Sequence, residues 1–232
     1  MIKPHKIGAD SLTLAVIADI LENGISLSLS SRAKKNINNC RNFLDKKTAE
    51  SNKPIYGINT GFGSLCNNKI ASKELEQLQR NLVLSHACGT GEEVPPKIVK
   101  IILLLKIHAL SYGYSGVQLI TVERLVDMFN EDIIPIVYQQ GSLGASGDLA
   151  PLAHMSLPLI GEGEVNIPDV GDNGYYKKRR SQKILKEMSW KPIQLASKEG
   201  LALLNGTQFM SAYSIWSLLK ARRLSYLSDM IG

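Results

Sequence analysis

The chain contains only three cysteines in 232 residues. Cys40, Cys66 and Cys88 are scattered, their number is odd, and no CxxC pair occurs. We therefore expect reduced thiols in a cytoplasmic protein, and neither a disulfide framework nor a cysteine-based zinc site. The N-terminus opens without a signal-peptide pattern, which agrees with that expected location.

Long apolar runs are also missing from the sequence. The most apolar segment, residues 98–110, is interrupted by Lys100, Lys106 and His108. It is too short and too charged to span a membrane, so the sequence predicts a buried helix there and no membrane partner.

Neither charge is in strong excess, because 27 Lys and Arg stand against 21 Asp and Glu, for a net charge of +6. Nucleic-acid binding requires basic residues concentrated on one face. The only dense basic cluster, residues 177–180, lies in a polar stretch, where we expect a solvated loop and no nucleic-acid partner. The length and the 44% hydrophobic content suit one large globular domain or two small ones.

Apolar residues recur at helical spacing along most of the chain. Asp10 or Ser11, Ser115, Asp148 and Ser197 are expected N-caps, because short polar side chains accept hydrogen bonds from a first helical turn. A strand or extended piece is expected at 133–138 and a turn-rich excursion, compatible with a small hairpin, at 165–174. The sequence thus predicts a mainly α-helical protein with a few short strands. The expected helices cover residues 10–22, 31–47, 72–86, 96–110, 115–130, 149–160, 197–205 and 208–232.

The most informative segment, residues 141–151, has the sequence GSLGASGDLAP. Because glycine has no Cβ, the amide nitrogen of Gly147 can approach the carbonyl of Ala145 unusually closely. Attack of that nitrogen on that carbonyl, with loss of water, would close an imidazolone ring. Loss of the Ser146 hydroxyl as a second water would leave an exocyclic methylidene. The product is an electrophile, which no ordinary side chain provides.

Ser146 has other interpretations besides ring formation. A serine-hydrolase elbow requires G-x-S-x-G, but Asp148 stands at the final glycine. A phosphate-binding loop would need a following Gly-Lys-Ser/Thr, which is missing. A simple turn at a helix start remains the alternative. A helix beginning after Asp148 would direct its positive end at the ring and stabilise negative charge developing there.

This segment resembles the prosthetic-group motif of the aromatic amino acid lyases, in which Ala-Ser-Gly becomes a methylidene-imidazolone. Three further segments resemble that family's motifs in the family's order. YGINTGFG at 56–63 is similar to the tyrosine loop, and KEGLALLNGT at 198–207 to the asparagine motif. LSHA at 84–87 resembles the form found in histidine ammonia-lyases.

The resemblance implies a fold and a domain division. Residues 1–207 would form the N-terminal prosthetic-group domain of the lyase fold, carrying the tyrosine loop, the tripeptide and the asparagine motif. Residues 208–232 would be the first, cut-off helix of its central bundle. The family's chains are considerably longer, so the resemblance covers only their N-terminal half.

The resemblance also implies roles for single residues. Ser146 would supply the electrophilic carbon within the ring made from Ala145, Ser146 and Gly147. Tyr56 would remove a β-proton from the substrate, although a phenol with an ordinary pKa of about 10 is a weak base near neutrality. The alternative is a loop tyrosine packed on its own glycines.

His86 and Asn205 are the expected substrate-binding residues. The resemblance implies that His86 faces the substrate side chain and favours an imidazole, and that Asn205 contacts a polar end of the substrate. A helix C-cap is the other interpretation of Asn205, and both can hold together. Neither a metal nor a nucleotide is expected as a cofactor, because His86, Cys88, His108 and His154 show no recognised ligand spacing.

The implied reaction is conversion of L-histidine to trans-urocanate and ammonia. Two alternatives stay open: a truncated or split fragment that needs a complementary chain, and a tyrosine ammonia-lyase or aminomutase. The implied partners are an amino acid substrate and either further copies in a homotetramer or a complementary C-terminal fragment.

Overall fold

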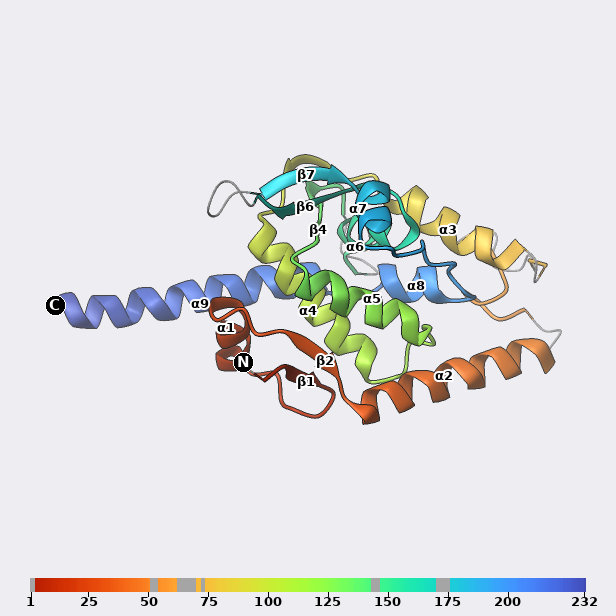
Figure 1. Cartoon of the computed structure of the whole chain (residues 1–232), viewed down its shortest axis with the longest axis horizontal. Helices are drawn as coiled ribbons and strands as arrows, with labels where there is room; N and C mark the ends of the chain where they lie inside the picture. The colour runs from red at the N-terminus through yellow and green to blue at the C-terminus, as the bar shows by residue number, and fades with distance from the viewer. Residues whose placement is uncertain (1–2, 51–53, 62–69, 72–73, 143–146, 170–175) are drawn as a thin grey trace.

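The computed structural model describes residues 3–50, 54–61, 70–71, 74–142, 147–169 and 176–232. The chain is mainly helical, as the sequence predicts, and its helices gather around α4 (Figure 1). The described helices are α1 (Leu14–Glu22), α2 (Ser31–Glu50), α3 (Leu75–His86), α4 (Pro96–Ser111), α5 (Leu119–Asn130), α6 (Leu149–Ser156), the 3-10 turn η3 (Leu157–Ile160), α7 (Ser181–Glu187), α8 (Glu199–Leu204) and α9 (Gln208–Ile231).

The described strands form three small sheets at the edges of this helical body. The first sheet is parallel, the second is an antiparallel pair, and the third has the order β4-β6-β7 with antiparallel neighbours. Their members are β1 (His5–Ile7) with β2 (Leu27–Leu29), β3 (Thr90–Glu93) with β5 (Tyr138–Gln140), and β4 (Ile134–Pro135), β6 (Glu164–Pro168) and β7 (Tyr176–Arg180).

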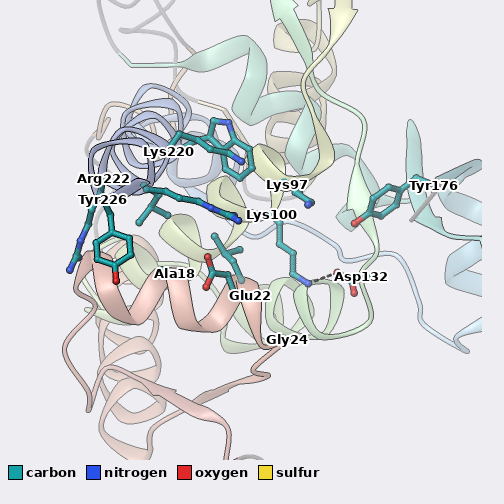
Figure 2. A pocket seen from close by; sticks show the side chains of 14 residues that line it. Ala18, Glu22, Gly24, Lys97, Lys100, Asp132, Tyr176, Lys220, Arg222 and Tyr226 are labelled. Carbon is teal, nitrogen blue, oxygen red and sulfur yellow. Dashed lines mark hydrogen bonds and ion pairs between the residues drawn. The ribbon is translucent and has the colours of Figure 1, made fainter. Parts of the chain in front are cut away.

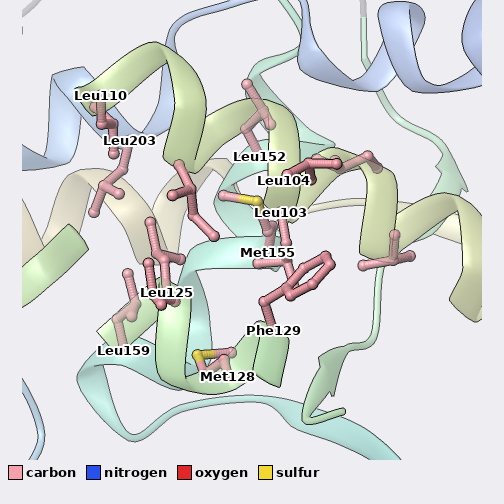
Figure 3. Close-up of a cluster of buried hydrophobic side chains, with 14 of the residues drawn as sticks. Leu103, Leu104, Leu110, Leu125, Met128, Phe129, Leu152, Met155, Leu159 and Leu203 are labelled. Carbon is pink, nitrogen blue, oxygen red and sulfur yellow. The ribbon is translucent and has the colours of Figure 1, made fainter. Parts of the chain in front are cut away.

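The centre of the core is α4, the helix that the sequence predicts to be buried. Its residues Leu103 and Leu104 are fully buried and lie close to Phe129 of α5 and Met155 of α6 (Figure 3). Burying one such side chain stabilises the fold by about 2 kcal/mol. A helix with apolar residues on most of its surface must be covered, and here α5 and α9 cover it, with α2 and the strands β1 and β4 also in contact.

Three predicted helix starts are wrong, and each has a local cause. Helix α1 begins after Thr13, whose hydroxyl accepts from the amide of Val16 at 3.3 Å, while Asp10 accepts from the amide of Lys6. Helix α5 begins at Leu119 and not after Ser115, because Gly116 has a φ of +72°, which a right-handed helical turn does not allow.

The third wrong start concerns α8. Ser197 does not cap it, because Arg41 of α2 takes both the carbonyl oxygen of Ser197, at 2.8 Å, and its hydroxyl, at 3.1 Å. Lys198 occupies the N-cap position in a left-handed conformation, with φ of 72°. The predicted single helix over 149–160 is divided into α6 and η3, since Pro158 has no N–H to continue the α-helical pattern.

The extended piece expected at 133–138 is two strands that pair in different sheets, β4 with β6 and β5 with β3. A hairpin forms near the expected position, but its second strand lies after 165–174: β6 covers Glu164–Pro168 and pairs with β7 at Tyr176–Arg180. The solvated loop predicted at 177–180 is wrong, because these residues form most of β7, although their side chains remain largely exposed. Helix α7 follows directly and was not predicted.

Helix α9 extends from the body toward the C-terminus (Figure 1). Its first turns pack against α4, whereas Leu224 and Ile231 are 66% and 85% exposed. None of the described helices combines the length and the apolar content that crossing a bilayer requires.

Candidate active site

The segments that carry Gly147 and Asn205 meet at a backbone junction between Gly147 and Gly206. These two glycines form an isolated parallel β-bridge, and the amide of Asp148 donates to the carbonyl of Gly206 at 2.9 Å. A Cβ on Gly147 would lie 2.5 Å from the Gly206 oxygen, and the φ of Gly147 is +112°. Packing and backbone conformation therefore both require glycine at position 147. Ala145 and Ser146 lie outside the described residues.

Asp148 lies at the start of α6, but its side chain binds the first turn of α9. Its side chain makes no capping hydrogen bond to α6, which contradicts the predicted cap. Its Oδ2 instead accepts from the amide of Met210, in the first turn of α9, at 3.1 Å. The carboxylate is buried, and a negative charge at a helix N-terminus is stabilised by the unpaired amides there. Asp148 thus joins the starts of α6 and α9.

Asn205 is the C-cap of α8, as its Asn-Gly sequence predicts. Its side-chain amide donates to the carbonyl of Leu201 at 2.9 Å, which fixes the orientation of the amide plane. Within the described part of the chain, its Oδ1 makes no hydrogen bond, and so it can accept one from a ligand. Its backbone carbonyl accepts from the Nζ of Lys106 at 2.8 Å.

Lys106 is a buried lysine on α4, only 1% exposed. Burial lowers its pKa to about 7, because the apolar surroundings disfavour the charged form. Sequence reasoning treated it only as an interruption of an apolar segment. The signal that could have found it is its place in the sequence, because Lys106 follows three leucines and precedes Ile107 in the most apolar segment of the chain.

The start of α8 is held by the carboxylate of Glu199, which is fully buried. This carboxylate accepts four hydrogen bonds: from the amide and the side chain of Gln118, from Thr121 Oγ1 and from the amide of Ala196, at 2.6–2.8 Å. The donors satisfy the buried charge and tie α8 to the start of α5. Glu199 lies within the asparagine motif, but sequence reasoning gave it no role.

His86 is the last residue of α3, as predicted, and it is partly buried. Its Nδ1 lies 2.8 Å from the carbonyl oxygen of Leu82. A carbonyl oxygen can only accept, so Nδ1 carries the proton, and the neutral ring has its lone pair on Nε2. Helices α3, α6 and α8 pack against one another, so His86 ends a helix of the group that carries Gly147 and Asn205.

A second histidine, His154 of α6, connects the chain after His86 to the chain after Gly147. Its Nε2 accepts from the amide of Gly89 at 2.9 Å, and its ring meets Tyr138 edge-on at 5.1 Å. Burial lowers the pKa of His154, so the neutral ring that this hydrogen bond requires is favoured. Sequence reasoning considered His154 only as a metal ligand.

Tyr56 lies on a separate turn and is 58% exposed. The turn is closed by the amide of Ile58, which donates to the carbonyl of Ile55 at 3.1 Å. The amide of Ile55 in turn donates to Asn59 Oδ1 at 2.6 Å. Phe62 and Gly63, the last two residues of the predicted tyrosine loop, lie outside the described residues, and the role of Tyr56 stays a prediction.

A cavity of about 1020 Å³ lies elsewhere, between α1, α4 and α9 (Figure 2). Its lining is basic and aromatic, with Lys97, Lys220 and Tyr226 among the residues drawn there. None of the predicted site residues lines it. Among the described residues, no group of three His, Cys, Asp or Glu could hold a metal ion.

Comparison with known proteins decides the family. A family model described as aromatic amino acid lyase matches residues 12–232. The chain belongs to the aromatic amino acid lyase family. It is 43% identical over 229 residues to the histidine ammonia-lyase of Alkaliphilus oremlandii. This match covers 98% of the chain and 43% of that relative, so the chain spans less than half the length of the curated lyase it resembles.

Solved structures of aromatic amino acid lyases agree with the fold. The crystal structure of histidine ammonia-lyase from Trypanosoma cruzi matches with a TM-score of 0.84 at 36% identity, over 97% of this chain and 42% of that one. Tyrosine aminomutase from Streptomyces globisporus matches with a TM-score of 0.81 at 32% identity, over 91% of this chain and 38% of that one. The predicted lyase fold is thereby confirmed.

Proposed function

We propose that the chain forms the ring-bearing part of a histidine ammonia-lyase, which converts L-histidine to trans-urocanate and ammonia. The observation that carries the proposal is the junction of Gly147 with Gly206, which requires glycine at the position where ring closure also requires it. The similarity to histidine ammonia-lyases, at 43% identity for one of them, supports the choice of substrate.

The residues present fit the proposed prosthetic group. Gly147 has no Cβ, and the start of α6 follows it directly, so that helix would present unpaired amides toward the ring. A methylidene-imidazolone made from Ala145, Ser146 and Gly147 would supply the electrophile that activates the substrate. Whether it takes up the amino group or attack comes from the aromatic ring is left open by these residues.

The substrate would be held by His86 and Asn205. With Nδ1–H donated to Leu82, the Nε2 of His86 can accept a hydrogen bond from an imidazole N–H. The Oδ1 of Asn205 can accept from an ammonium group, since its Nδ2 is already bonded to Leu201. Tyr56, which is 58% exposed, would remove the β-proton.

The proposal includes assembly with further chains in the cytoplasm, as a homotetramer or with a complementary fragment. The exposed apolar side chains of α9, such as Leu224, support an interface there. A fragment that is inactive alone is therefore the second candidate. A tyrosine ammonia-lyase or aminomutase is the third, and the 32% identity to a tyrosine aminomutase supports it.

Two measurements test the proposal. Mass spectrometry of the peptide containing residues 145–147 should show the loss of two waters, and Ser146→Ala should abolish the second loss. An intact wild-type peptide would refute ring formation in this chain. Incubation with L-histidine, followed by the ultraviolet absorbance of urocanate, then separates the candidates. Turnover by the chain alone excludes an inactive fragment, and turnover of L-tyrosine only would replace the histidine assignment.

A further inference from the structure

Lys106 is a buried lysine that pairs with no carboxylate in the part of the chain that the structure describes. Among the described residues its one hydrogen bond runs from Nζ to the carbonyl oxygen of Asn205, at 2.8 Å, and no ion pair involves it. Burying an ammonium group is costly, and a methionine would fill similar space without that cost. The property that distinguishes lysine here is a strong donor aimed at one carbonyl.

That carbonyl belongs to the peptide plane between Asn205 and Gly206. The Nζ of Lys106 donates to the carbonyl oxygen of this peptide. The amide nitrogen of Gly206 belongs to the same peptide plane. A Cβ on Gly147 would lie 2.9 Å from that nitrogen, so the backbone of Gly147 lies directly against the plane. The carbonyl of Gly206, one peptide further on, accepts from the amide of Asp148.

The hydrogen bond from Lys106 also lies at the C-terminal end of α8. Asn205 is the C-cap, and the carbonyl groups of a last helical turn lack amide partners within the helix. A cation there is favoured by the negative end of the helix. Rotation of the Asn205–Gly206 plane would therefore move both the Asn205 side chain and the surface on which Gly147 lies.

We propose that Lys106 is a positioning residue, whose Nζ holds the Asn205–Gly206 peptide in the orientation that aligns the Asn205 side chain with the backbone of Gly147. The use of this alignment in catalysis rests on the proposed function, whereas the alignment itself does not. Lys106 touches neither substrate nor ring atoms in this scheme and acts only through Asn205 and Gly206.

The test is a pH titration of the backbone amide signals of the substrate-free chain by NMR spectroscopy. Because burial lowers the pKa of Lys106 to about 7, the Gly206 amide signal should shift with a midpoint near pH 7. Burial lowers this pKa, and no charged group among the described residues contributes to the shift. Lys106→Arg, which stays protonated, should remove the titration while keeping the Gly206 and Asp148 signals near their low-pH positions.

Lys106→Met should also remove the titration but displace the signals of Gly206 and Asp148. Lys100→Met is the matched control on the same helix, since Lys100 pairs with Asp132, and it should leave the Gly206 titration unchanged. A Gly206 signal whose pH response is the same in wild type and Lys106→Arg, or a Met variant with unaltered Gly206 and Asp148 signals, overturns the proposal. If the Met variant does not fold, the comparison of wild type with Lys106→Arg still decides it. These signals are read without turnover, so failure of the lyase proposal leaves this result intact.

Discussion

The amide of Asp148 donates to the carbonyl of Gly206 at 2.9 Å, which fastens the first residue before α6 to the residue that follows the end of α8. The side chain of Asp148 continues the connection by accepting from the amide of Met210 in α9. Three helix ends therefore share one buried residue. The position of Asn205 relative to Gly147 is set by this arrangement and not by either segment alone.

Gly147→Ala should destabilise the chain by about 3 kcal/mol, because a new Cβ would clash with the Gly206 oxygen and φ would stay in the left-handed region. The midpoint of urea unfolding measures this effect. Gly24→Ala is the control, since its φ is +62° and a Cβ there would meet nothing within 4 Å. It should cost about 1 kcal/mol from backbone strain alone. Equal losses of stability in the two variants would show that the contact of Gly147 with Gly206 adds nothing to the cost of the substitution.

Glu199→Gln should cost about 3 kcal/mol in the free energy of unfolding. The side-chain NH2 that replaces one carboxylate oxygen would face a group that can only donate, such as the backbone amide of Ala196, and that amide would lose its acceptor. The matched control is Glu123→Gln, which loses only the surface ion pair with Lys34 and should change stability by less than about 0.5 kcal/mol. Chemical denaturation of both variants at one pH checks the prediction, and similar small losses would contradict it.

Stability should fall as pH falls below about 6.5, the ordinary histidine pKa, because burial lowers the pKa of His154 in the folded state. Between the two pKa values the unfolded chain binds the extra proton, and so acid favours unfolding. His154→Gln removes this contribution, so the difference in stability between wild type and variant should shrink as pH falls. Burial also lowers the pKa of His108. Because His108 is present in both proteins, its contribution cancels in the difference between wild type and His154→Gln. A difference that stays constant from pH 7.5 to 5 would count against the assignment.

The buried Lys106 predicts a change in stability at alkaline pH. Its pKa is about 7 in the folded chain and about 10.4 when unfolded, so the unfolded state holds more protons between these values. The free energy of unfolding should therefore rise with pH across this window, by up to about 1.4 kcal/mol per pH unit from this group. Lys106→Met should lack that rise and Lys100→Met should retain it. Parallel pH profiles of wild type and Lys106→Met would refute the prediction.

Periodic patterns made most of the helices predictable. The apolar segment that becomes α4 and the long helix at the C-terminus are examples, since burial and spacing are local properties of the sequence. Capping residues were less predictable. Ser197 has the right chemistry for a cap, but Arg41, far away in the sequence, takes its carbonyl and hydroxyl. A local propensity can be overridden by a partner that only folding brings near.

The residues of the candidate site also fall into a group that the sequence predicts and a group that only the structure reveals. Motifs alone predicted Tyr56, His86, Ser146, Gly147 and Asn205 as site residues, because reactive groups and glycine requirements are visible as residue types in order. The supporting residues Lys106, Glu199 and His154 were missed, because each acts through a hydrogen bond to a segment far away in the chain.

The sequence by itself determined the family, the helical class and the need for glycine at position 147, since these depend on residue identity and short-range geometry. Only the tertiary structure decided that Gly147 lies against Gly206, and that the buried side chains of Lys106 and Asp148 form hydrogen bonds beside that contact. Hydrogen bonds such as those of Lys106 to Asn205 and of Asp148 to Met210 join separate helices, and no local pattern encodes the distance between them. Burial then gives these bonds their effect, because a polar group removed from water must find its partner within the protein.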